Sequence, residues 1–341
     1  MIILYVILAI FVFGFMIFIH ELGHFMFAKL FKVAINEFSI GMGPKIISKK
    51  GKDGVTYSIR ALPFGGYVAM EGEDSESENP NAFNKKAAWQ RFIIVIAGAM
   101  MNLITGILIM TIMTATTPKF GTTTIGQFYD DATSTEFLQV DDKIIKVENT
   151  KVHTANELSY EISRKGNKPI RLTIEREGQI ITLDNVVFPQ DIIDGVSFGK
   201  MDFKVYGEER SFASVLKNSF YSCKSTIKMI YDSLFDLITG RYGMEQVSGP
   251  VGVTGAITTA AKSGPYSFFY IVVVISINLG VFNLLPIPAL DGGTLLLLLI
   301  EMIIRRPIPQ KIEYGIKAIG FALLMGFAII ITFKDVIFLF K

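Results

Sequence analysis

The first 19 residues form an unbroken apolar run that ends in His20-Glu21-Leu22-Gly23-His24. The run carries no charge, and Gly14 is its one strong helix breaker. About 20 apolar residues are enough for a helix to cross a bilayer, and the segment lacks the positive start and small-residue cleavage site of a signal peptide. We therefore predict a retained membrane-spanning helix with ionisable side chains near one end, where they are costly unless they have a function.

The His-Glu-x-x-His pattern predicts a metal site at the end of this helix. Positions four apart lie on one helix face, so His20 and His24 can bind one ion while Glu21 lies beside it as a base. Two of the chain's three histidines are in this motif. The alternative is a chance match on an ordinary helix, which would leave three polar side chains in lipid without a role.

Three further apolar spans predict a polytopic α-helical membrane protein with four transmembrane helices. They cover residues 92–117, 266–290 and 318–333. Half of the 341 residues are hydrophobic, and the length leaves room for one domain outside the membrane. The net charge of +2 argues neither for nor against nucleic acid, and no nucleic-acid partner is expected. The single cysteine, Cys223, is expected to serve in packing.

The distribution of lysine and arginine predicts the orientation in the membrane. Basic residues are dense between the first two spans, in residues 29–91, and recur in the short turn 301–311. Short positively charged connections stay in the cytoplasm. Both termini and the long segment 118–265 are therefore expected outside the cytoplasm, in a multi-pass membrane protein.

The segments between the spans divide the rest of the chain. Residues 1–117 hold the first two helices and, at 36–70, short apolar runs punctuated by glycine and proline, which predict a small sheet at the cytoplasmic membrane face. Residues 118–190 are predicted to form an α/β domain, whose helix begins at a capping box of Thr154 and Glu157. Residues 266–341 hold the last two spans.

Residues 191–265 are predicted to be a connector that contains one amphipathic helix, residues 212–239. Its apolar residues recur at helical spacing, with lysines on the opposite face. Two interpretations stay open. The helix either packs on the preceding domain or lies along the outer membrane face.

A third metal ligand is expected from another ionisable residue at membrane depth, because a catalytic zinc site normally has three protein ligands and a water. Asp291 fits, in the sequence Asn283-Leu-Leu-Pro-Ile-Pro-Ala-Leu-Asp-Gly-Gly293. Two prolines and two glycines break the helix there. Irregular backbone at that depth is tolerated where it is buried in protein or lines a cavity, so the Asp291 carboxylate can turn toward the two histidines.

The motifs at 20–24 and 283–293, in this order, resemble the site-2 protease family of intramembrane zinc metalloproteases. Within it the chain is similar to the bacterial group that carries a PDZ domain and cleaves anti-sigma factors. Further matches are Ser248-Gly-Pro-Val-Gly252 and Phe64-Gly-Gly-Tyr-Val68. The resemblance covers nearly the whole chain.

The resemblance implies a role for each matching residue. His20, His24 and Asp291 would bind Zn²⁺, and Glu21 would be the catalytic base. Asn283, Asn278 and Asn102 would contact the substrate, with Gly98 and Asn102 matching a motif of the second span. The 36–70 sheet would receive the substrate as an extended strand, and the domain at 118–190 would be a single PDZ-like domain inserted outside the cytoplasm.

The chain departs from the family pattern mainly in that domain. The glycine-rich loop that binds a peptide carboxylate in PDZ domains is not recognisable around residues 122–130. The domain is therefore expected either to bind C-terminal peptides or to act as a size filter.

The predicted function is hydrolysis of peptide bonds inside the bilayer. The expected partners are the lipid bilayer and single-span membrane proteins, such as anti-sigma factors or signal-peptide remnants, after trimming by an upstream site-1-type protease. Two alternatives come from other classes of protein. A non-catalytic membrane scaffold with a structural zinc site and a PDZ peptide-binding domain would need four closed protein ligands. A zinc transporter would need polar ligands on several helices.

Overall fold

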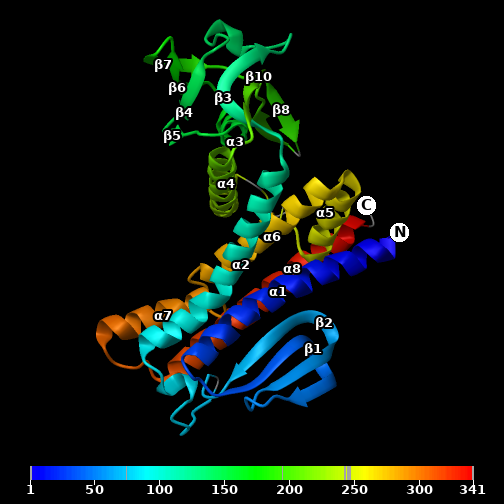
Figure 1. Ribbon diagram of the computed structural model, residues 1–341, viewed down its shortest axis with the longest axis vertical. Helices are drawn as coiled ribbons and strands as arrows, with labels where there is room; N and C mark the ends of the chain where they lie inside the picture. The colour runs from blue at the N-terminus through cyan, green and yellow to red at the C-terminus, as the bar shows by residue number, and fades with distance from the viewer. Residues whose placement is uncertain (1, 74, 194, 242, 244–246, 340–341) are drawn as a thin grey trace. The chain divides into compact units, whose positions relative to one another are not determined.

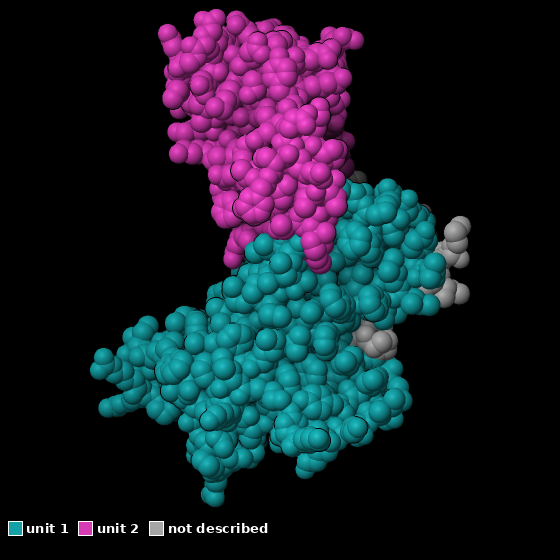
Figure 2. Space-filling view, in the orientation of Figure 1, with its two compact units in different colours: residues 1–108, 243–341 teal, residues 109–242 magenta. Residues whose placement is uncertain are grey.

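The computed structural model describes residues 2–73, 75–193, 195–241, 243 and 247–339. The chain divides into two compact units (Figure 2), unit 1 with residues 1–108 and 243–341 and unit 2 with residues 109–242.

Unit 1 contains most of the helical part of the chain (Figure 1). Among the residues that the structure describes, four helices are long and apolar enough to cross a membrane, and they match the four predicted spans. The predicted span at 266–290 ends earlier than expected, because residues 285–290 leave the helix and a second helix follows. The helices are α1 (Ile2–Leu30), α2 (Ala88–Thr116, which continues into unit 2), α5 (Pro250–Ser263), α6 (Pro265–Leu284), α7 (Asp291–Ile304) and α8 (Gln310–Leu339).

Helix α5 lies inside the range predicted as a connector with a single helix. Its sequence is rich in glycine, alanine and threonine, which carries little apolar periodicity. Its start is held from far along the chain, because the Asp335 carboxylate accepts hydrogen bonds from the backbone N–H groups of Gly249 and Gly252, each 2.9 Å long. A carboxylate at a helix N-terminus satisfies free amides and suits the helix dipole. Ser248-Gly-Pro-Val-Gly252 is thus the capped entry to α5.

A β-hairpin covers the range between the first two spans. Its strands are β1 (Ile35–Lys50) and β2 (Thr56–Met70), which pair antiparallel. A short 3₁₀ turn, η1 (Phe83–Lys85), leads into α2. The buried core beneath the hairpin combines Phe38 and Val68 of the strands with Ala28 of α1, Ile94 of α2 and Leu298 of α7.

Unit 2 is built on an antiparallel sheet in the strand order β10-β3-β4-β6-β7, with β5 paired to β4. Helix α3 packs against β3, β4 and β9. Glu177 and Gly178 join β6 to β7 with positive φ at both, a turn whose twist matches the strands. The elements are β3 (Lys119–Phe128), η2 (Ser134–Glu136), β4 (Lys143–Val147), β5 (Thr150–Lys151), α3 (Ala155–Lys165), β6 (Ile170–Arg176), β7 (Gln179–Val186), β8 (Gln190–Ile193), β9 (Val196–Gly199), β10 (Phe203–Glu209) and α4 (Phe212–Ile238).

The predicted domain boundary at residue 190 is too early. Strand β10, within the predicted connector, pairs with β3 along nearly its whole length. The pairing joins segments about eighty residues apart, and such long-range contacts leave no local pattern in the sequence. Phe203 of β10 is completely buried in the core of unit 2, so the sheet is incomplete without it.

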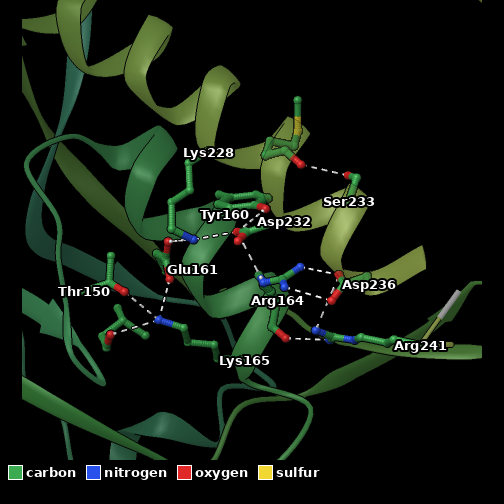
Figure 3. A network of polar contacts seen from close by, with 12 residues as sticks. Thr150, Tyr160, Glu161, Arg164, Lys165, Lys228, Asp232, Ser233, Asp236 and Arg241 are labelled. Carbon is green, nitrogen blue, oxygen red and sulfur yellow. Dashed lines mark hydrogen bonds and ion pairs between the residues drawn. The ribbon is translucent and has the colours of Figure 1, made fainter. Parts of the chain in front are cut away.

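Helix α4 is tied to α3 by a network of ion pairs (Figure 3). Lys228 lies 2.9 Å from Glu161 and 2.6 Å from Asp232, and Arg164 donates a 2.9 Å hydrogen bond to Asp236. His153, two residues before α3, stacks on Tyr221 of α4 with ring centroids 4.0 Å apart.

Another face of α4 exposes a row of apolar side chains. This apolar row consists of Phe212, Leu216, Phe220, Tyr231, Phe235 and Ile238. Phe212 and Ile238, near the two ends of the helix, are each more than four-fifths exposed. Packing on unit 2 and an exposed apolar row therefore occur together, although the sequence had suggested them as alternatives.

Candidate metal centre

The metal motif lies in the last turns of α1, where an unbroken helix puts His20 and His24 on one face. Their Nε2 atoms are 3.2 Å apart. Both histidines are buried, with 9% and 8% of their surface exposed. The helix can carry both rings close to α2 because a Cβ at Gly98 would meet His24 Nε2 at 2.3 Å and His20 Cε1 at 2.9 Å. Gly98 is therefore the residue that makes room for the two rings.

Asp291 reaches the histidines from the other end of the chain. Its Oδ2 atom is 3.1 Å from His20 Nε2 and 3.4 Å from His24 Nε2. That oxygen is buried and has no hydrogen-bond partner among the described residues. Among the described residues, these three form the one cluster of metal-binding side chains, with ligand atoms within 4.8 Å of one another.

The backbone around Asp291 explains the Leu-Asp-Gly-Gly sequence. Residues 285–290 fold back on themselves, with Ala289 at a φ of +75°, and Asp291 is the first residue of α7. A Cβ at Gly292 would meet the carbonyl oxygen of Leu285 at 2.0 Å, and one at Gly293 would meet that of Ile287 at 2.5 Å. Only glycine fits at these two positions, and the tight fold turns the preceding carboxylate toward α1.

The spacing of the three ligand atoms fits a zinc ion. Zinc bonds to nitrogen and oxygen are about 2.0–2.1 Å long, so two ligand atoms of a tetrahedral site lie about 3.3 Å apart. The three separations of 3.1, 3.2 and 3.4 Å match this edge. Two neutral ring nitrogens and one carboxylate oxygen are also the donor types that zinc takes in open, catalytic sites.

Glu21 lies beside the cluster and is not one of its three members. Its Oε2 atom accepts a 3.2 Å hydrogen bond from the backbone N–H of Val68 in β2. A Cβ at Gly66, two residues earlier, would come within 3.6 Å of Glu21 Cγ. The Gly66–Val68 edge of the hairpin therefore runs directly past the carboxylate.

A polar cluster inside the hairpin braces the strands next to this edge. Glu37 pairs with Lys45 at 3.0 Å and Arg60 at 2.9 Å, and it accepts a hydrogen bond from Ser58. Burial opposes ionisation of Glu37, but these donors outweigh it and lower its pKa to about 2. The carboxylate thus stays ionised and holds Arg60, which also contacts Tyr67.

The three predicted substrate contacts differ in their surroundings. Asn278 and Asn283 are half-buried on α6, the helix that leads into the irregular segment before Asp291. Asn102 is completely buried, and its amide nitrogen lies 3.5 Å from His20 Nδ1. A completely buried side chain does not offer a surface to a substrate, so this geometry favours another role for Asn102. A substrate contact by any of the three stays a prediction.

Sequence reasoning missed the backbone groups that complete the site. His24 Nδ1 is held by the carbonyl oxygen of Ile94 at 2.9 Å, and Glu21 by the amide of Val68. Backbone groups carry no residue-specific signal. Only the small residues at 66 and 98, which allow close approach, could have pointed to them.

An apolar polytopic chain with a two-histidine, one-carboxylate centre and a second carboxylate beside it defines the class of membrane-embedded metalloproteases. The sequence comparisons agree. Residues 8–327 match the model of peptidase family M50, and the chain belongs to this family. It is a zinc-dependent intramembrane metalloprotease of the site-2 type and a multi-pass membrane protein.

Several curated relatives are similar over nearly their whole length. A protein of Clostridium acetobutylicum named "Putative zinc metalloprotease" is 38% identical, over 98% of this chain and 97% of the relative. The regulator of sigma-W protease RasP of Bacillus subtilis is 29% identical, over 97% and 98%. The zinc metalloprotease RasP of Geobacillus kaustophilus is 28% identical, over 95% and 96%.

Proposed function

We propose that the chain cleaves the membrane-embedded part of single-span proteins at a zinc ion bound by His20, His24 and Asp291, with Glu21 as the base. The observation that carries the proposal is the convergence of three donor atoms from α1 and α7 at separations that suit a tetrahedral ion. When bound there, zinc lowers the pKa of a coordinated water to about 7 and polarises the scissile carbonyl.

The chain's own residues handle the proton and the substrate. Glu21 accepts the proton of the attacking water and later returns it to the leaving amine. The hydrogen bond from Val68 supports this role, because it holds the carboxylate at the side of the cluster rather than within it. Asn278 and Asn283 are proposed to contact the substrate backbone.

The hairpin is proposed to receive the substrate as an extended strand. A transmembrane helix must open before its peptide bonds can be attacked, and its freed backbone groups then need partners. A sheet edge supplies them by strand addition. The Gly66–Val68 edge supports this step, because it passes beside Glu21 and a strand added there would enter next to the base.

The substrate class is proposed from the relatives. One is named "Regulator of sigma-W protease RasP", which supports an anti-sigma factor or a similar single-span protein as substrate. Signal-peptide remnants share the same chemistry, a short apolar helix with small extramembrane parts. Prior trimming by a site-1-type protease is part of this proposal.

Unit 2 is proposed to be a PDZ-like domain outside the cytoplasm that restricts which substrates enter. Gly199 of β9 packs so tightly on the end of α3 that a Cβ there would lie 2.5 Å from the carbonyl oxygen of Ile162. This leaves no room for an added peptide strand between β9 and that end of α3, which favours size restriction over peptide binding. The apolar row of α4 is proposed to lie in the outer membrane face.

The proposed orientation has both termini and residues 118–265 outside, with 29–91 and 301–311 in the cytoplasm. Single cysteines introduced at positions 50 and 150, in a Cys223→Ser background, test it with an impermeant reagent on intact cells. Labelling at 150 alone is expected. Labelling at 50 alone would reverse the orientation.

The catalytic assignment is tested with Glu21→Gln. The variant keeps the shape of the side chain and removes the base, so cleavage of a model single-span substrate should fall to background while zinc stays near one per chain. Retained cleavage would remove Glu21 from the mechanism.

A further inference from the structure

The two histidines present the same ring atom to Asp291, so the opposite ring nitrogen of each faces away from the cluster. Nδ1 of His24 meets the carbonyl oxygen of Ile94 at 2.9 Å, and Nδ1 of His20 meets the side-chain amide of Asn102 at 3.5 Å. Both partners belong to α2. A single helix therefore stands behind both histidines.

The α2 residues concerned are spaced by four, which places Ile94, Gly98 and Asn102 on one face of the helix. Gly98, in the middle, touches both rings. The outer residues meet one ring nitrogen each. The face thus has the layout of an outer shell, in which each ligand histidine is held by its second nitrogen.

Such a shell requires a hydrogen-bond acceptor next to each Nδ1 atom. Ile94 supplies one, but Asn102 in its present amide orientation does not. A histidine that binds a metal through Nε2 carries its proton on Nδ1 and must donate it. The Ile94 carbonyl is an acceptor. The Asn102 atom that faces His20 is Nδ2, a donor, while Asn102 Oδ1 is buried with no hydrogen-bond partner among the described residues.

A half-turn of the Asn102 amide gives the His20 ring the acceptor it needs. The oxygen and nitrogen of an amide have nearly the same size, and their assignment follows the hydrogen-bond network. After the turn Oδ1 faces the Nδ1 proton of His20. The residue is otherwise fixed, because it is completely buried and its backbone carbonyl accepts a 2.7 Å hydrogen bond from the buried Ser276 hydroxyl of α6.

We propose that Asn102 is a positioning residue of the metal centre: its side-chain carbonyl accepts the Nδ1 proton of His20 and holds that ring with Nε2 directed at zinc. The proposal rests on the ligand set proposed above. It assigns Asn102 to the ligand His20 instead of to the substrate. Asn102 is then the side-chain counterpart of the Ile94 carbonyl, and the two residues fix one histidine each.

Zinc affinity of the purified full-length protein, measured by competition with a chelator, tests this role. Asn102→Leu keeps the size and removes the acceptor, and we expect affinity to fall roughly 10–100-fold, the usual cost of losing such a partner. Asn102→Asp keeps an acceptor in place, and its affinity should equal or exceed that of the native protein. If the leucine variant does not fold, Asn102→Ala, which also lacks the acceptor, replaces it.

Other roles predict other results. If Asn102 only fills space, the leucine variant keeps its affinity and the aspartate variant, with a buried charge, loses it. If Asn102 contacts substrate, both variants keep their affinity for zinc and change KM. Either result overturns the proposal. Gly326→Ala on α8, where an added Cβ meets nothing within 4 Å, should leave affinity unchanged.

A failure of the underlying ligand set has a different signature. His20→Ala would then retain zinc. If His20→Ala loses zinc while Asn102→Leu keeps it, the ligand set stands and only the role of Asn102 is wrong.

Discussion

The metal cluster of unit 1 and the ion-pair network of unit 2 both bury ionisable side chains, but they match charge in different ways. In the network every acid meets a lysine or arginine, as Glu161 does with Lys228 and Asp236 with Arg164 (Figure 3). In the metal cluster the Asp291 oxygen meets two ring nitrogens, and all three atoms can offer lone pairs to one point. Matched charges indicate a structural role, while convergent donors indicate a place for a cation.

The contrast extends to the surrounding backbone. The acids of the network lie on α3 and α4, two regular helices whose i, i+4 pairs form without special geometry. The metal cluster needs a positive φ at Ala289 and close approaches at Gly98 and Gly292. Backbone strain of this kind persists only where the surrounding structure enforces it, and it concentrates at functional sites.

The largest effect is a loss of zinc affinity, expected when an added side-chain atom crowds the metal cluster. Gly98→Ala would place a methyl group 2.3 Å from His24 Nε2, so one ring must leave its position. We expect zinc affinity to fall by more than the roughly 10–100-fold that loss of an outer-shell partner costs. Gly326→Ala on α8, where a Cβ meets nothing within 4 Å, is the matched control and should bind zinc normally. Equal zinc affinity in both variants would mean that the rings are not held against α2.

A smaller effect, a loss of stability confined to unit 2, is expected when one partner of an ion pair in the network is removed. Asp236→Ala removes the more deeply buried carboxylate that Arg164 pairs with and leaves it only Asp232, 3.3 Å away. Breaking a buried pair costs about 3–5 kcal/mol when the partner is left unpaired, so the cost here should lie below that range. Hydrogen exchange of the α3 amides should report this loss, while zinc affinity stays unchanged.

Asp184→Ala is the control for that measurement. It breaks the pair with Arg171, in which both side chains are 57% exposed, and an exposed pair contributes only about 0–1 kcal/mol. If the α3 amides exchange hydrogen at the same rate in both variants, the network contributes no more to stability than a surface ion pair does.

The smallest effect is a loss of network stability at low pH. Burial raises the pKa of Asp232, but hydrogen bonds from Lys228 and Tyr160 outweigh it, and the net pKa lies below the ordinary 3.8. A lowered folded-state pKa contributes stability that is present above the ordinary value and is lost as pH falls through the folded value. In the native protein, protection of the α4 amides against hydrogen exchange should therefore decrease as the pH is lowered below 3.8. In Asp232→Asn it should depend less on pH. An identical pH dependence in both proteins would exclude Asp232 as its source.

The sequence predicts what depends on local pattern. The four spans follow from apolar runs, and the meeting of His20, His24 and Asp291 follows from helical spacing and a broken helix at membrane depth. The sequence does not predict β10 or α5. Strand β10 is defined by its pairing with β3, and α5 by a cap from Asp335. The acceptor for His24 and the donor to Glu21 are backbone groups of Ile94 and Val68, which no residue type marks. Contacts between distant segments are what the sequence leaves open.

The zinc content of Asp291→Ala, measured by mass spectrometry beside native protein and Glu21→Gln, tests the central claim most directly. The claim is that three side chains from α1 and α7 bind the ion while Glu21 only moves a proton. It predicts near one zinc per chain in the native protein and in Glu21→Gln, and near none in Asp291→Ala, because two histidines alone bind weakly. Full zinc occupancy in Asp291→Ala would contradict it, since the third ligand would then lie elsewhere in the chain.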